Sequence, residues 1–290
     1  MVIFILLLLL LLPFVAAQWQ LCGNSGNSDY TPNSTYLANL MLLSSTLPKK
    51  AASDTSQLFA TDAVGHAPDT VFALTLCYGN NTADICEDCV AAAFQKGQVG
   101  CEYNKDATLY YDECMVRYSN QKFLATTTDD QNWAIVSNTK DFPTSSYSFR
   151  LFLYTLINIT APLAANSSRR FMTSRLDVSS FPTLYFLMQC TPDLTTNDCA
   201  ACFQVVSQLT FEYLDGPRGG RVLGTRCIMR YEIYPFFRGE PMRRVINLAA
   251  EVPAINNTTS SESMPVTVYG RAAAPPPDPV VQTTVKQHGT

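Results

Sequence analysis

Ten cysteines are the residues of this 290-residue sequence whose type and spacing point most directly to chemistry. The spacing Cys77-x8-Cys86-x2-Cys89 recurs as Cys190-x8-Cys199-x2-Cys202, and each copy has a further cysteine 25 residues later, Cys114 or Cys227. Cysteines spaced in this way can bind zinc, exchange disulfides or form structural disulfides. The constant offset of 113 residues indicates two tandem copies of one small domain.

The sequence favours structural disulfides over metal or redox chemistry. His66 and His288 are the only histidines that could complete a zinc site, and the outer cysteines do not form another CxxC. A redox CxxC would not need the strictly spaced outer cysteines. The even number of cysteines, all after an apolar leader, is typical of paired cysteines in the secretory pathway. We therefore expect no metal and no cofactor.

The two copies also predict the disulfide partners. At offset 113, Cys22 maps to Ile135 and Cys101 to Leu214, so the two cysteines that copy two lacks are expected to be partners, Cys22–Cys101. Three pairings remain for the other four cysteines of copy one. A bond within the CxxC would close one helical turn and add little restriction. The favoured bonds are Cys77–Cys86, Cys89–Cys114, Cys190–Cys199 and Cys202–Cys227.

The start of the chain predicts entry into the secretory pathway. Residues 1–17 hold a leucine run and end in small residues, as a cleaved signal peptide does, and the apolar run is short for a bilayer span. After the leader no stretch approaches the ~18–20 apolar residues of a membrane span. Six N-glycosylation sequons agree with an extracellular surface: Asn33, Asn80, Asn158, Asn166, Asn256 and Asn257. The net charge of −4 argues against nucleic-acid binding.

Each copy is predicted to fold as an α+β domain in which helices pack on an antiparallel sheet. Copy one, 18–126, should hold a helix from about residue 35, strands at 59–64 and 70–78, a helix carrying the CxxC, and two strands that turn at Asp112-Glu113. Copy two, 132–239, should follow with helices at 149–159 and 197–209, strands at 171–176 and 184–189, and a hairpin at 221–223 and 227–234. The segment from Cys22 to Asn33 should be irregular and the tail, 240–290, disordered around the proline-rich stretch 272–279.

The doubled C-x8-C-x2-C motif resembles the ginkbilobin-type, or stress-antifungal, domain of plants. Tandem pairs of this domain form secreted cysteine-rich repeat proteins, plasmodesmata-located proteins and the ectodomains of cysteine-rich receptor-like kinases. Residues 187–199 and 219–235 look like the second domain of those ectodomains, and the resemblance runs from about Cys22 to Phe237. It implies two domains, each a five-stranded antiparallel sheet packed by two helices, with the disulfide pairing given above.

The resemblance also implies mannose binding through an asparagine beside the first cysteine, an arginine six residues before the last cysteine and a glutamate five residues after it. In copy one, these positions hold Gly23, Thr108 and Ser119, so copy one departs from the pattern.

Copy two keeps Arg221 and Glu232, and the asparagine falls near Asn138 or Thr139. The arginine and the glutamate can share one sugar only if the chain reverses at Gly224-Thr225, because one continuous strand would separate them by ~36 Å. A guanidinium and a carboxylate would then hydrogen-bond neighbouring hydroxyls. The alternative is an ordinary cross-strand ion pair on a solvated hairpin.

Recognition is the function that these features favour. We find no Ser/His/Asp set and no kinase signature in the sequence. We expect a module secreted to the apoplast in plant defence or cell-surface signalling, with a mannose-type or wall glycan as ligand, or another ectodomain as partner. The alternative is the protein-interaction ectodomain of a truncated receptor-like kinase at the plasma membrane, without sugar binding, since residues 275–279 resemble the stalk before a membrane span.

Overall fold

The structure is a computed structural model that describes residues 19–23, 29–127, 133–142, 146–178, 181–246 and 281–287. The predicted signal peptide, the sequons at Asn256 and Asn257 and the proline-rich stretch lie outside these residues.

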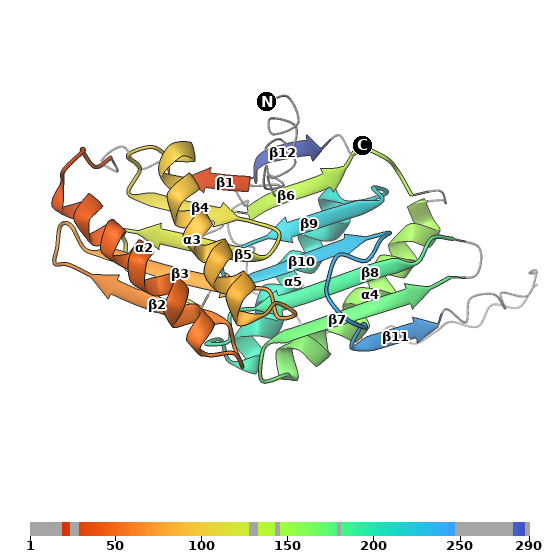
Figure 1. The fold of residues 1–290 in the computed structure, drawn as a ribbon. Coiled ribbons are helices and arrows are strands. Elements are labelled where there is room, and N and C mark those ends of the chain that lie inside the picture. The colour runs from red at the N-terminus through yellow and green to blue at the C-terminus, as the bar shows by residue number, and fades with distance from the viewer. Residues whose placement is uncertain are drawn as a thin grey trace, which may run out of the picture.

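Domain 1 is a five-stranded antiparallel sheet with two helices on one face (Figure 1). The strand order is β1-β4-β5-β3-β2. The predicted fold of this copy is confirmed, except that β1 replaces part of a segment for which no strand was expected. The elements are β1 (Trp19–Cys22), α2 (Thr35–Ser53), β2 (Phe59–Val64), β3 (Val71–Cys77), α3 (Ala83–Gly100), β4 (Asp106–Tyr110) and β5 (Cys114–Ser119).

Domain 2 repeats this arrangement and adds two strands from the C-terminal segment. Its elements are β6 (Trp133–Asn138), α4 (Ser146–Asn166), β7 (Phe171–Asp177), β8 (Leu184–Cys190), α5 (Thr196–Tyr213), β9 (Gly219–Leu223), β10 (Cys227–Glu232), β11 (Arg243–Ile246) and β12 (Val281–Gln287). The strand order is β11-β7-β8-β10-β9-β6-β12, in which β11 and β12 each pair parallel to their neighbour. The prediction of a fully disordered tail is therefore wrong at these two strands.

Three of the helices begin where a hydroxyl side chain caps the first turn. Ser34, Thr82 and Thr195 accept hydrogen bonds from backbone N–H groups three residues on, which satisfies otherwise unpaired donors. Helix α4 runs through Pro162 to Asn166 and so exceeds the predicted end at residue 159. Buried Ala164 and Ala165 pack its last turn into the core, so tertiary packing offsets the lost hydrogen bond.

The expectation that no stretch after the leader approaches the length of a membrane span is wrong for α4, which is long and apolar enough to cross a membrane and is the one such helix in the described part of the chain. Its inner side chains Phe149, Leu153 and Leu156 are buried in the core of domain 2, and the helix packs on β7 and β8. In this fold α4 is therefore a core helix with an apolar outer face.

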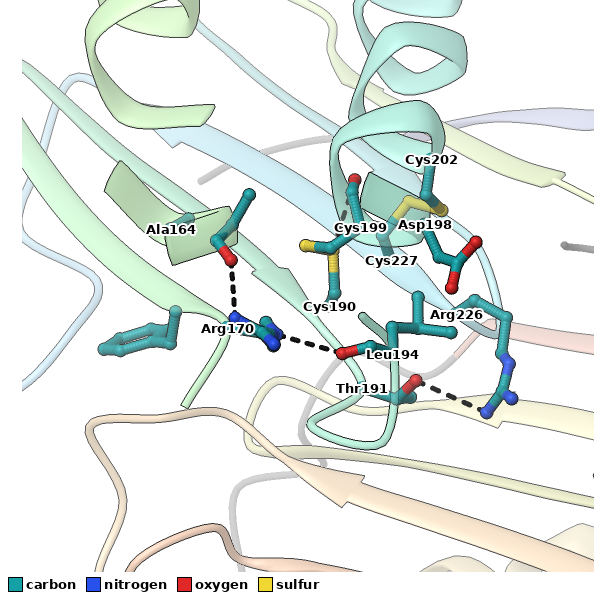
Figure 2. Close-up of a disulfide and its surroundings, with 12 residues drawn as sticks. Ala164, Arg170, Cys190, Thr191, Leu194, Asp198, Cys199, Cys202, Arg226 and Cys227 are labelled. Carbon is teal, nitrogen blue, oxygen red and sulfur yellow. Dashed lines mark hydrogen bonds between the residues drawn. A yellow bond between two sulfur atoms is a disulfide. The ribbon is translucent and has the colours of Figure 1, made fainter. Parts of the chain in front are cut away.

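Five disulfides join the ten cysteines: Cys22–Cys101, Cys77–Cys86, Cys89–Cys114, Cys190–Cys199 and Cys202–Cys227. This is the pairing that the sequence predicts, and it leaves no thiolate to bind zinc. Figure 2 shows how the loop after Cys190 is held from two sides. Arg170 Nε donates to the Leu194 carbonyl at 3.0 Å, and Arg226 Nη1 donates to the Thr191 hydroxyl at 3.3 Å.

The two sheets pack against each other through the faces that carry no helices, so α2 and α3 lie in front of one sheet and α4 and α5 behind the other (Figure 1). One buried cluster joins both domains; it includes Trp19, Leu74, Leu76, Tyr110 and Met115 of domain 1 and Val136, Phe171, Leu187, Leu223 and Ile228 of domain 2. Buried Gln189 adds polar contacts, since its Oε1 accepts from Gly79 N at 3.0 Å. The apolar contact makes the domains one packed unit.

Candidate functional site

The two domains hold each other through reciprocal contacts between an arginine and a hairpin tip. Arg230 Nη1 lies 3.3 Å from Asp112 Oδ1, and Arg117 Nη1 lies 3.2 Å from Thr225 Oγ1. Arg230 stands 113 residues after Arg117, and Thr225 stands 113 residues after Asp112. The arginine of each domain therefore contacts the same hairpin position in the other domain. Such reciprocity is the mark of an isologous, two-fold interface.

The register of the sheets identifies the domain 2 counterpart of the asparagine position that the resemblance implies. Leu21 pairs with Thr108 in domain 1, and Val136 pairs with Arg221 in domain 2. Because Arg221 is the counterpart of Thr108, Val136 is the counterpart of Leu21, and Asn138 is therefore the counterpart of the residue after Cys22. The sequence-based mapping of Cys22 to Ile135 is therefore wrong by two residues. The segment that joins the first strand to the rest of the domain differs in length between the two copies.

The three positions lie close together on the helix-free face of the second sheet. Ser137 pairs with Gly220, which places Asn138 beside Gly219, and Gly219 pairs with Glu232. Asn138, Gly219 and Glu232 thus form one row across β6, β9 and β10. Arg221 lies two residues further along β9 on the same face, because side chains alternate between the faces of a strand. The predicted chain reversal is present at residues 224–226.

A cavity of about 360 Å³ opens at this row. That volume is near the lower end of the roughly 300–1,000 Å³ that small-molecule sites occupy. The cavity is lined by Val136, Ser137, Asn138, Lys140, Arg218, Gly219, Gly220, Arg221, Glu232, Ile233 and Tyr234. The predicted site residues Arg221 and Glu232 therefore meet in one concavity with Asn138.

Glu232 of β10 is 6% exposed, and its carboxylate lies next to Gly219 of β9. Its Oε1 accepts a hydrogen bond from Arg230 Nε at 3.1 Å, and Tyr234 also hydrogen-bonds the carboxylate. A Cβ on Gly219 would stand 2.0 Å from Glu232 Oε2, so only glycine at residue 219 leaves room for the carboxylate where it lies. Burial raises the pKa of Glu232, while Arg230 and Arg221 act in the opposite direction.

Arg221 is 7% exposed and connects the cavity to domain 1. Its Nη1 lies 2.6 Å from Asp112 Oδ1, and its guanidinium stacks 4.4 Å from the centre of the Trp19 ring. Burial lowers the pKa of Arg221, as does neighbouring Arg230, while Asp112 opposes both. In the sheet, the residue opposite Arg221 is Arg230 and not Glu232, so the simple cross-strand ion pair is the wrong description.

Sequence reasoning missed Asp112 and Trp19 as partners of this site. Asp112 was recognised only as a turn residue. The duplication gave one indication of which residues pair, because Arg117 and Phe123 recur as Arg230 and Phe236. In each domain the arginine stacks on this aromatic ring, at 4.5 Å in domain 1 and at 4.3 Å in domain 2. Trp19 left no signal, since its contact with Arg221 depends on how the sheets cross.

Domain 1 has no equivalent charged row. Thr108 and Ser119 occupy the arginine and glutamate positions and are buried, and a Cβ on Gly23 would meet Asp106 at 2.7 Å. Four of the predicted sequons are in the described residues: Asn33, Asn158 and Asn166 are exposed, and Asn80 is partly buried at the domain boundary. Their glycosylation stays a prediction.

Comparison with known proteins agrees with this fold. The family model for salt stress response/antifungal domains matches residues 21–121 and 136–234. The tandem DUF26 ectodomains of two cysteine-rich receptor-like proteins of Arabidopsis thaliana are similar in structure. PDLP8 has a TM-score of 0.61 and 21% identity over 74% of this chain and 96% of that chain, and PDLP5 has 0.58 and 19% over 75% and 98%.

Sequence relatives extend the comparison to receptor kinases. Cysteine-rich receptor-like protein kinase 10 of Oryza sativa is 39% identical over 81% of this chain, which spans only 37% of that relative. Putative cysteine-rich receptor-like protein kinase 9 of Arabidopsis thaliana is 34% identical over 74% of this chain and 80% of the relative. With a family match in both domains and relatives of this identity, the chain belongs to the salt stress response/antifungal family, as a tandem pair of its domains.

Proposed function

We propose that this chain is an extracellular, non-enzymatic recognition module in plant defence or cell-surface signalling, and that it binds a mannose-type or wall glycan in the cavity of domain 2. The observation that carries the proposal is the row of Asn138, Gly219 and Glu232 beside Arg221 in one cavity. An amide, a carboxylate and a guanidinium supply the donors and acceptors that neighbouring sugar hydroxyls require. The half-exposed ring of Tyr234 adds an apolar wall for the face of a sugar.

The extracellular setting is supported by the cysteines and the sequons. Ten cysteines in five disulfides suit an oxidising compartment. Three sequon asparagines stand exposed where a glycan can be carried without unfolding. Cleavage of residues 1–17 and secretion to the apoplast are part of the proposal.

The lining of the cavity supports binding without catalysis. Glycoside hydrolysis ordinarily uses two carboxylates that flank the scissile bond. Glu232 is the one carboxylate among the residues that line this cavity, and Arg230 already hydrogen-bonds it. The relatives are named as kinases, and this chain spans about a third of the length of several of them.

A glycan array of the purified, glycosylated protein tests the proposal. We expect binding to one class of glycan, and at least tenfold weaker binding after Glu232→Gln, which keeps the shape and removes the charge. Asp215→Asn is the matched control, because Asp215 forms an exposed ion pair with Arg150 elsewhere in domain 2. The proposal fails if the wild-type protein binds no glycan or if Glu232→Gln binds as the wild type does.

A second function, docking of another ectodomain without sugar binding, is favoured by the outer face of α4. Tyr147, Leu151 and Tyr154 are exposed there at helical spacing and form one apolar row. The sequon residue Asn158 continues this row, and a glycan on it would cover part of the face. Chemical cross-linking of purified tandem ectodomains separates the two functions: a heteromer lost with Tyr154→Lys, together with an empty glycan array, would replace sugar binding by docking.

A further inference from the structure

The cavity of domain 2 carries more positive than negative charge. Lys140, Arg218 and Arg221 line it together with a single carboxylate, Glu232. A neutral sugar needs no such excess, because its hydroxyls are satisfied by uncharged donors and acceptors as well as by charged ones.

Two of these charges are already compensated within the protein. Arg221 pairs with Asp112 at 2.6 Å, and Glu232 pairs with Arg230 at 3.1 Å. Arg230 also lies 3.3 Å from Asp112, so two arginines and two carboxylates form one neutral, closed cluster. Arg221 and Glu232 are the members of this cluster that line the cavity, and the cluster contributes no net charge to a ligand.

The remaining cations stand together at the rim. The N–H of Arg218 donates to the Lys140 carbonyl at 2.8 Å, which holds the two residues side by side. Arg218 Nε donates to the Asp141 backbone carbonyl at 2.7 Å, and the Lys140 N–H donates to Asn138 Oδ1 at 2.9 Å. Within the described residues neither Lys140 nor Arg218 has a carboxylate within ion-pair distance. Lys140 is exposed and Arg218 is partly buried, and both line the cavity beside the row that contains Asn138.

This inference rests on the proposed glycan site and names its ligand class. We propose that the cavity takes a glycuronate, a saccharide whose ring carries a carboxylate, with Lys140 and Arg218 on the carboxylate and Asn138 and Glu232 on the hydroxyls. A carboxylate satisfies both rim cations at once, and charge-assisted hydrogen bonds are roughly twice as strong as neutral ones. A wall polymer of uronic acids presents such a group on every ring.

Calorimetric titration with three soluble hexasaccharides tests the ligand class. The probes are hexagalacturonate, its fully methyl-esterified form, which has the same ring and no charge, and mannohexaose. We expect the acid to bind at least ten times more tightly than its ester, and this advantage to shrink as salt rises. The double substitution Lys140→Gln with Arg218→Gln should lower the affinity for the acid to that for the ester and leave the ester unchanged. A sulfated hexasaccharide as a fourth probe separates a carboxylate site from a general anion site.

Each result supports or overturns the inference. Equal affinity for acid and ester, tighter binding of mannohexaose, or binding of the sulfated probe alone would overturn it and leave the proposed glycan site standing. Absence of binding by all four probes, in a protein that also binds nothing on the array, would overturn the proposed function itself. Loss of acid binding in the double variant, with ester binding retained, supports the glycuronate.

Discussion

Gly219 has no side chain, and this leaves the space in which the carboxylate of Glu232 lies. Gly219 pairs with Glu232 across the sheet, and any larger residue would meet the carboxylate. The neighbouring Gly220 has a different role, because a Cβ there would stand 2.8 Å from Leu214 and Tyr231 in the core. Adjacent glycines thus serve the two faces of one strand, and they can be tested against each other.

Gly219→Ala should abolish glycan binding and leave folding nearly intact, because the flexible end of Glu232 can move away from the new methyl group. Gly220→Ala should instead lower the free energy of unfolding by about 1–3 kcal/mol, the usual cost of overpacking a core. Urea unfolding and glycan titration of both variants check this pair. Equal effects of the two variants on both measurements would contradict the assignment of the two faces.

The raised pKa of Glu232 predicts a pH dependence of stability. The folded state holds this proton more tightly than the unfolded state does, because burial disfavours the charged form. The contribution of Glu232 to stability is therefore greatest below its ordinary pKa of 4.5 and is lost as the pH rises through the raised value. Relative to Glu232→Gln, the free energy of unfolding of the wild type should fall over that window. A difference that grows with pH would show that Arg230 and Arg221, and not burial, dominate.

At the residue scale, the sequence predicted the two charged residues of the candidate site but not the residues that contact them. Arg221 and Glu232 follow from their spacing to Cys227 through the family resemblance. Asp112 and Trp19 do not, because their contacts cross from one domain to the other and depend on how the sheets are placed.

Among the elements, the helices and most strands were predictable, including the edge strand β2, but β1, β6, β11 and β12 were not. Helix α3 and strands β3 and β5 carry strong periodicity and cysteines. Strands β1 and β11 are four residues each at the edges of their sheets, where one side is unpaired and little apolar pattern is needed. The missed β1 is also the strand that carries Cys22 and Trp19.

The Cys22–Cys101 disulfide fixes β1 to the end of α3, and domain 2 has no counterpart of it. Replacing both cysteines by serine should lower the free energy of unfolding by up to about 4 kcal/mol, because the bond closes a long loop in the unfolded chain. Removing Cys202 and Cys227 together should cost about 3 kcal/mol, since their loop is shorter. Urea unfolding of the two double variants checks the order, and an equal or reversed cost would contradict it.

For the whole molecule, the packing of two helix-free faces makes one packed unit from two similar halves. The buried cluster between the sheets contributes apolar contact, and the reciprocal arginine contacts fix the orientation. The sequence predicted the duplication but not this arrangement, because the inner faces of the sheets show the same alternation whether they meet each other or a third protein.

Asp112→Ala should therefore weaken the whole molecule and not just a surface pair. It leaves Arg221 and Arg230, which are nearly buried, without their shared carboxylate. We expect a loss of about 2–3 kcal/mol, below the ~3–5 kcal/mol for breaking a fully buried pair, since Asp112 is 32% exposed. Asp215→Ala, which breaks the exposed pair with Arg150, should cost less than about 1 kcal/mol. Equal losses of unfolding free energy in urea would show that the charged contacts of Asp112 with Arg221 and Arg230 do not stabilise the two-domain unit.

The most direct test of the account is a crystal structure of the tandem unit with a bound saccharide. We expect a sugar ring in the cavity between β6, β9 and β10, with Asn138 and Glu232 on its hydroxyls and the domains packed through their helix-free faces. A saccharide bound elsewhere, for example on the outer face of α4, with this cavity empty, would contradict it.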